Sequence, residues 1–167
     1  MRTNLTSQIT LNRVSTKYYK PENAVERSVL TRFEKVPTDI YESVDEGVAH
    51  IANEIAGRIQ DRQREGKFFV IGAGTGASLR PLYAELVRKH KDEGLSFRNV
   101  VIFNLYEYYP LAPESAGSSF AQLKELWIDQ IDIDKQNVFT IDGSIPQEAI
   151  LEYCRLYEQR LQTFGGM

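Results

Sequence analysis

The chain has 167 residues, of which 42% are hydrophobic and 26% are charged, a composition typical of one globular domain and incompatible with wholesale disorder. Its formal net charge of −3 and its pI near 5.5 argue against a nucleic-acid partner, which usually requires a basic face. The single cysteine excludes an intramolecular disulfide framework and a multi-cysteine zinc site. No apolar run is long enough to cross a bilayer, and the N-terminus lacks the apolar core of a signal peptide. We therefore expect a cytoplasmic protein with no membrane partner and no metal.

Residues 1–40 are predicted to form a polar N-terminal arm with a short helix. The helix is expected to begin near Pro21, because proline is favoured in the first turn, and to run to about Phe33. Its expected inward-facing side chains are Val25, Val29 and Leu30. A separate α/β domain is predicted over residues 41–167.

From residue 43 onward the apolar residues recur with the period of an amphipathic helix. Ser43 and Glu46 form a capping box at its start, and Gly66 is expected to end it. The predicted buried stripe consists of Val44, Val48, Ile51, Ala52, Ile55 and Ile59.

The rest of the chain alternates between apolar strands and amphipathic helices. Strands are predicted over residues 68–71, 99–103 and 137–141, and helices are predicted over 79–94 and 120–131. A final helix is predicted to be capped by Ser144 and Gln147, with Pro146 near its first turn, and to end at Gly165. Its predicted buried stripe is Ile150, Leu151, Cys154, Tyr157 and Leu161.

This alternation predicts the fold class. Strands that are apolar on both faces and alternate with helices indicate a doubly wound, Rossmann-like α/β fold, with a parallel sheet and helices on both faces. Three strands make a narrow sheet with unpaired edges. We therefore expect a domain that is incomplete at its C-terminus and a protein that forms a homo-oligomer.

The loop after the first strand is the strongest candidate site. In sheets of this class ligands bind beyond the carboxyl ends of the strands, and free N–H groups at a helix N-terminus favour an anion. The loop is therefore predicted to bind phosphate, although a tight turn without a ligand would need the same glycines. Its residues are Gly74, Thr75, Gly76, Ala77 and Ser78.

A dinucleotide is an alternative ligand for this loop. Gly72, Gly74 and Ala77 satisfy the G-x-G-x-x-A pattern of dinucleotide-binding domains. That pattern also requires an acidic residue about 20 residues further on, at the end of the next strand. The acidic residue at that strand end, Glu107, lies further along the chain, so the pattern is only partly met.

Several motifs in unbroken order resemble glucosamine-6-phosphate deaminases. That family has a strand followed by a Thr-Gly loop and a helix, a Ser-Phe-x-x-Val segment, a strand ending in Phe-Asn-Met-Asp-Glu-Tyr, and then Asp-His-Val-Asp-Ile. The corresponding segments here are 74–79, 96–100, 103–108 and 129–133. The resemblance covers about residues 43–166 and implies the isomerisation and deamination of an amino-sugar phosphate. We expect no cofactor.

The resemblance assigns roles to individual residues. Thr75, Gly76 and Ser78 fall where the family binds the sugar phosphate, and Ala77 replaces a serine or glycine. Tyr106 falls on the family's aspartate, the general base that moves a proton between C1 and C2 of the sugar. A phenol with a reference pKa near 10 is a poor base at neutral pH, so Tyr106 predicts altered or lost deaminase chemistry. Glu107 takes over as base only if the loop redirects it.

The glycine-rich Asp-Gly-His segment that the family places after the last helix is not found in these 167 residues. Three functions therefore stay open: a deaminase-like enzyme, a non-catalytic module that binds a sugar phosphate or regulates, and a dinucleotide-binding half-domain.

Overall fold

The computed structural model describes residues 23–33, 36 and 38–166. The chain divides into two compact units, Met1–Gly47 and Val48–Met167. Helix α2 begins in the first unit and continues into the second. The predicted boundary between residues 40 and 41 stays a prediction.

The first unit contains helix α1, Ala24–Thr31, and the start of α2. The Asn23 side chain caps α1 by accepting a hydrogen bond from the Glu26 N–H at 3.0 Å. The expectation that Val25 and Val29 face inward is wrong, because they are 75% and 58% exposed. Within the described part of the first unit, no sheet covers this eight-residue helix. The expected helix start at Pro21 lies outside the described residues.

Helix α2 spans Val44–Arg64 and begins as predicted at Ser43, whose hydroxyl accepts a hydrogen bond from the Glu46 N–H at 3.1 Å. The Glu46 carboxylate in turn accepts from the N–H of Glu42, one residue before the cap. Ala52 and Ile59 are buried as predicted, whereas Val44 and Ile51 are exposed. Ile51 lies about 100° around the helix from Ala52, which puts it beyond the edge of the buried stripe.

The second unit is built on three parallel strands in the order β1-β2-β3. They are β1, Phe69–Ala73, β2, Val100–Asn104, and β3, Val138–Phe139. Ala73 pairs with Asn104, so β1 and β2 end side by side. Strand β3 has two residues instead of the predicted five: the expected first residue, Asn137, lies in the 3-10 turn Lys135–Asn137, and the strand ends at Phe139.

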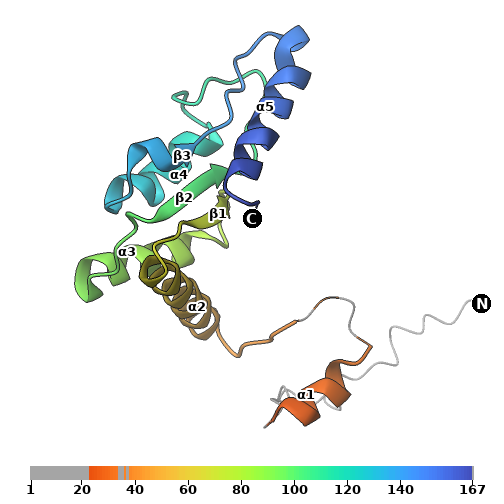
Figure 1. Cartoon of the computed structure of the whole chain (residues 1–167), viewed down its shortest axis with the longest axis vertical. Helices are drawn as coiled ribbons and strands as arrows, with labels where there is room; N and C mark the ends of the chain where they lie inside the picture. The colour runs from red at the N-terminus through yellow and green to blue at the C-terminus, as the bar shows by residue number, and fades with distance from the viewer. Residues whose placement is uncertain (1–22, 34–35, 37, 167) are drawn as a thin grey trace, which may run out of the picture. The chain divides into compact units, whose positions relative to one another are not determined.

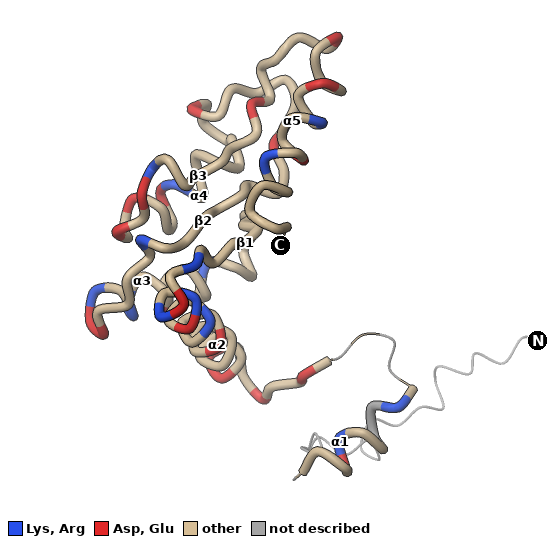
Figure 2. Tube along the Cα trace, viewed as in Figure 1, with Lys and Arg blue, Asp and Glu red and all other residues tan. Residues whose placement is uncertain are grey.

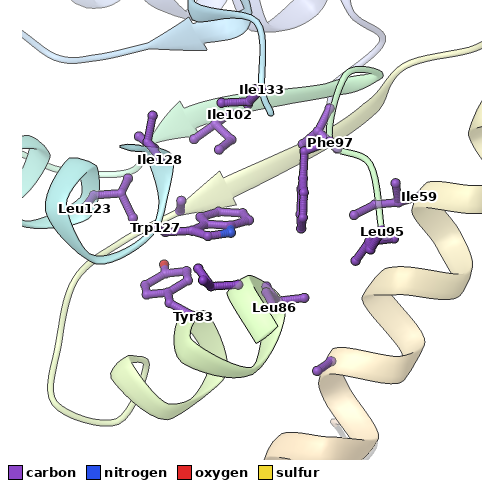
Figure 3. Packing of buried hydrophobic residues seen from close by; sticks show 14 residues of the cluster. Ile59, Tyr83, Leu86, Leu95, Phe97, Ile102, Leu123, Trp127, Ile128 and Ile133 are labelled. Atoms are coloured by element: carbon purple, nitrogen blue, oxygen red, sulfur yellow. The ribbon is translucent and has the colours of Figure 1, made fainter. Parts of the chain in front are cut away.

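Helices cover both faces of the sheet, as predicted (Figure 1). On one face, α3, Arg80–Glu93, and α4, Ser119–Leu126, enclose the main core. Tyr83 of α3 stacks on Trp127 with ring centroids 5.0 Å apart, and Phe97 meets the same indole edge-on (Figure 3). On the other face, the Phe103 ring of β2 contacts Tyr157 of α5, Ile150–Thr163.

The start and the buried face of α5 differ from the prediction. The capping box is wrong, since the N–H and hydroxyl of Ser144 both donate to Asp142 and a 3-10 turn over Gln147–Ala149 precedes the helix. Leu151 and Cys154 are exposed, against the prediction that both are buried. Tyr157 and Leu161 face inward as predicted, together with Tyr153, because Tyr157 and the following Phe164 pack on the aromatic side chains of β2 and β3.

Candidate functional site

The glycine-rich loop and the 105–118 loop meet at the carboxyl ends of β1 and β2. Leu105 donates its N–H to the Ala73 carbonyl at 2.9 Å, which aligns the starts of the two loops. The Tyr106 ring lies so close to Gly74 that a Cβ atom at position 74 would be 2.9 Å from its Cε1 atom. Gly74 is therefore required for this close approach of a side chain to the backbone.

Thr75 and Tyr106 are joined by several hydrogen bonds. The Thr75 N–H donates to the Tyr106 phenol oxygen at 2.9 Å, and the two hydroxyls lie 3.0 Å apart. The phenol donates to the Thr75 carbonyl, and the Thr75 hydroxyl also contacts the Ser119 hydroxyl at 3.0 Å. Hydrogen bonding to the Thr75 hydroxyl is the main reason that the pKa of Tyr106 lies below its ordinary value.

The next three residues of the loop present free backbone donors. Gly76, Ala77 and Ser78 are exposed, and their N–H groups donate to no other described residue. The loop closes by a hydrogen bond from the Leu79 N–H to the Gly76 carbonyl at 3.1 Å, immediately before α3. Leu79 at the N-cap makes no side-chain capping bond. The arrangement therefore offers several N–H donors at a helix N-terminus, where an anion is favoured.

Glu107 binds the start of α4. Its carboxylate accepts hydrogen bonds from the Ser118 hydroxyl at 2.6 Å and from the N–H groups of Ser119, Phe120 and Tyr108 at 2.8, 3.0 and 3.0 Å. Burial acts to raise the pKa of Glu107, but these four hydrogen bonds outweigh it and lower the pKa below the ordinary value. The carboxylate is thus stabilised as an anion and fastens the 105–118 loop to α4.

The buried Tyr83 and the half-buried Tyr157 hold the ends of the strands that carry the loops. The Tyr83 hydroxyl donates to the Gly74 carbonyl at 2.6 Å, and the Tyr157 hydroxyl lies 2.9 Å from the Asn104 carbonyl. Burial raises the pKa of Tyr83 to about 12 and also raises the pKa of Tyr157. Both hydroxyls are therefore neutral donors that hold the backbone.

Sequence reasoning missed Ser119 and Asn104. Asn104 donates its side-chain N–H to the Tyr106 carbonyl at 3.0 Å, and its Oδ1 atom is buried with no partner among the described residues. A polar residue at the end of the apolar run Val100–Phe103 is the signal that would have identified Asn104. No local signal identifies Ser119, because only the folded chain places it beside Thr75.

The described residues contain no group of three or more histidine, cysteine, aspartate or glutamate side chains that could hold a metal ion. In the same part of the chain, no helix combines the length and apolar character that crossing a membrane requires. A hollow of about 670 Å³ lies at the edge of β1, lined in part by Arg58, Phe68, Val70 and Phe164. None of the five loop residues from Gly74 to Ser78 lines this hollow.

Comparisons with known proteins agree with the fold and show the family. Residues 42–166 match the family described as glucosamine-6-phosphate isomerases/6-phosphogluconolactonase. A putative glucosamine-6-phosphate deaminase-like protein of Bacteroides thetaiotaomicron is 60% identical over the whole chain, which spans 25% of that relative. A glucosamine-6-phosphate deaminase of Bacillus velezensis is 36% identical over 126 residues, 75% of this chain and 48% of that enzyme.

A solved structure of a monomeric glucosamine-6-phosphate deaminase superposes with a TM-score of 0.69 and 26% identity. The match covers 76% of this chain and 50% of that structure. The chain therefore spans between a quarter and a half of the length of these relatives. With a family match over three quarters of its length, the chain belongs to the glucosamine-6-phosphate isomerase/6-phosphogluconolactonase family.

Proposed function

We propose that this chain binds an amino-sugar phosphate through the loop Gly74–Ser78 and so forms the phosphate-binding part of a deaminase-like site. The observation that carries the proposal is the set of free N–H groups at Gly76, Ala77 and Ser78, which leads directly into an uncapped helix N-terminus. A phosphate group offers several acceptor oxygens and a negative charge to such a site. The relatives named as glucosamine-6-phosphate deaminases support an amino-sugar phosphate as the ligand.

The residues at positions 106 and 107 are poorly suited to the proton-transfer step of deaminase chemistry. A general base must accept a carbon-bound proton at neutral pH, and a neutral phenol at Tyr106 has little capacity to do so. Glu107 is a carboxylate, but its oxygens accept four hydrogen bonds from the 105–118 loop and the start of α4. We therefore propose that this chain by itself has little or no deaminase activity.

The second candidate is a non-catalytic sugar-phosphate-binding or regulatory module. It is favoured because the Glu107 carboxylate already accepts four hydrogen bonds within the protein. The same observation disfavours the dinucleotide reading, in which an acidic residue at this strand end accepts hydrogen bonds from a ribose. A cytoplasmic location and self-association are further parts of the proposal.

The test of phosphate binding is Gly76→Val, measured by isothermal titration calorimetry with glucosamine 6-phosphate. A Cβ atom at position 76 would meet nothing within 4 Å, so the variant should fold normally and place its side chain in the space where phosphate would bind. We expect binding to be lost while the circular dichroism spectrum stays close to that of the wild type. Gly57→Val, in α2 and equally open, is the control and should bind normally.

Three outcomes would count against the proposal or separate the candidates. Retained binding by Gly76→Val would show that the loop is only a turn. Release of ammonia from glucosamine 6-phosphate by the wild-type chain would contradict the non-catalytic reading, and binding of NAD in place of the sugar phosphate would favour the dinucleotide reading.

A further inference from the structure

We propose that the Tyr106 phenol is an internal competitor for the phosphate-binding loop, which sugar phosphate must displace in order to bind with full affinity. The proposal rests on the proposed function, because it concerns the same loop. It assigns Tyr106 a role in setting ligand affinity, which is distinct from proton transfer.

The hydrogen bonds of Thr75 provide the first argument. The phenol oxygen of Tyr106 accepts from the Thr75 N–H at 2.9 Å and lies 3.0 Å from the Thr75 hydroxyl. A backbone N–H and a hydroxyl that converge on one oxygen are the donors that a phosphate oxygen requires. Tyr106 thus takes the first donors of the loop, whereas the N–H groups of Gly76, Ala77 and Ser78 remain without a partner among the described residues.

The position of the aromatic ring provides the second argument. The ring lies against Gly74, where even a Cβ atom would be only 2.9 Å from it. While the ring lies there, the phenol oxygen occupies the position beside the Thr75 N–H and hydroxyl that a phosphate oxygen would need. Binding that uses Thr75 together with the free donors therefore requires the Tyr106 side chain to rotate away.

The surroundings of Tyr106 allow this rotation without unfolding the loop. The side chain is 38% exposed, so it has an open direction in which to turn. The backbone on either side is held independently, by the Asn104 side chain at the Tyr106 carbonyl and by the four hydrogen bonds of Glu107. Displacement is therefore a movement of one side chain.

Charge determines which occupant is preferred. A phenol is neutral at pH 7, whereas a phosphate ester carries a negative charge that the α3 N-terminus attracts. Phosphate therefore displaces the phenol once the phosphate concentration is high enough. The hydrogen bonds between Tyr106 and Thr75 increase the phosphate concentration that is needed. A neutral sugar without phosphate gains no such advantage and is excluded.

The test compares the wild-type chain with Tyr106→Phe, which keeps the ring and removes only the hydroxyl. Isothermal titration calorimetry with inorganic phosphate, and separately with glucosamine 6-phosphate, gives the affinities. We expect Tyr106→Phe to bind both about threefold or more tightly, since it no longer offers the competing hydrogen bonds. Amide hydrogen exchange at Thr75, followed by NMR without ligand, should be faster in Tyr106→Phe than in the wild type.

Tyr108→Phe is the matched control, because Tyr108 lies on the same loop, is 59% exposed, and has a hydroxyl that bonds to no other described residue. It should change neither the affinities nor the exchange at Thr75. Equal binding by the wild type and Tyr106→Phe would contradict the proposal that Tyr106 competes with phosphate, and it would leave the proposed function intact. Weaker binding by Tyr106→Phe would also overturn it, by making the hydroxyl a ligand-binding group. If neither protein binds phosphate, the proposed function and the competitor both fail.

Discussion

Glu107 accepts four hydrogen bonds, three from backbone N–H groups and one from the Ser118 hydroxyl. Two of the backbone donors, Ser119 and Phe120, belong to the first turn of α4, where the helix dipole also favours a negative charge. The ionised carboxylate is thus part of the structure, and protonating it removes charge-assisted hydrogen bonds. These contacts, rather than its position next to Tyr106 in the sequence, determine the protonation state of Glu107.

Glu107→Gln should lower the free energy of unfolding by about 1–2 kcal/mol at neutral pH, because the charge-assisted bonds are weakened. The folded-state pKa of Glu107 lies below its ordinary value of 4.5, so native Glu107 releases its proton at lower pH than the unfolded chain does. Its contribution is therefore complete above pH 4.5 and is lost as pH falls through the lowered pKa. Urea unfolding followed by circular dichroism at neutral and at acid pH measures both effects.

The expected result is a difference between the wild type and Glu107→Gln that is large at neutral pH and shrinks in acid. Glu114→Gln, exposed on the same loop, is the control and should have little effect at either pH. A difference that stays constant with pH would mean that the charge of Glu107 contributes nothing.

At the scale of elements, the 105–118 loop fits against the turn that follows β3. The Leu111 N–H donates to the Gly143 carbonyl at 3.1 Å, and a Cβ atom at Gly143 would lie 2.4 Å from the Tyr108 carbonyl oxygen and 2.5 Å from that of Leu111. The turn is itself held by Asp142, which accepts from Ser144 and whose N–H donates to the Tyr153 hydroxyl. The loop beside the candidate site is therefore positioned by β3 and α5 as well as by β2.

Gly143→Ala should lower the free energy of unfolding by about 1–3 kcal/mol, because two backbone carbonyls must move to admit the methyl group. Thermal and urea unfolding measure the change. Gly57→Ala is the matched control, since a Cβ atom there meets nothing within 4 Å. It lies in the interior of α2 and should raise stability by about 0.5–1 kcal/mol. Equal stability of Gly143→Ala and the wild type would contradict the backbone-to-backbone fit.

At the scale of the whole second unit, β1 pairs with β2 along one side only. In a parallel sheet the backbone N–H and C=O groups of alternate residues point to opposite sides of a strand. The Phe69 N–H and the Ala73 carbonyl form hydrogen bonds on the β2 side, so the backbone groups of Val70 and Gly72 point away from β2. The hollow of about 670 Å³ lies along this edge and is also lined by Phe164, Gly165 and Gly166, which follow α5. Charges of both signs are interspersed along the neighbouring α2 (Figure 2). Two copies of the chain are therefore not kept apart at this edge by repulsion between charges of one sign.

We expect this edge to make the 167-residue chain self-associate, which light scattering at micromolar concentration should detect as dimers or larger species. Phe68 is 50% exposed and lines the hollow, so Phe68→Lys puts a charge at the edge and should shift the chain towards monomer. Leu151→Lys, at an 85% exposed position on α5, makes the same type of change elsewhere and should leave association intact. A wild-type chain that is monomeric at every concentration would contradict the prediction.

The α/β class, the three strands and the glycine-rich loop followed from the sequence, because each depends on short-range patterns. A run such as Val100–Phe103 is apolar on both faces, which is what a strand covered on both sides requires. Gly66 ended its helix as predicted, because a residue at φ +67° is favourable only for glycine. Local patterns also placed Thr75 and Tyr106 in the loops that follow the first two strands, whereas only the folded chain shows that these strands are neighbours.

What these residues do there was decided by tertiary structure. The Tyr106 hydroxyl bonds to Thr75, 31 positions away, and Glu107 bonds to Ser118 and Ser119, and no periodicity encodes either contact. The buried face of α5 was likewise set by the aromatic side chains it meets, which left the predicted stripe residues Leu151 and Cys154 exposed and turned Tyr153 inward beside Tyr157. Hydrophobic periodicity specifies that a face is buried, but hydrogen-bond partners and the exact face depend on which segments pack together. The sequence by itself therefore determined the fold class and the presence of a glycine-rich loop after the first strand. The tertiary structure alone decided which N–H groups of that loop are without a partner among the described residues.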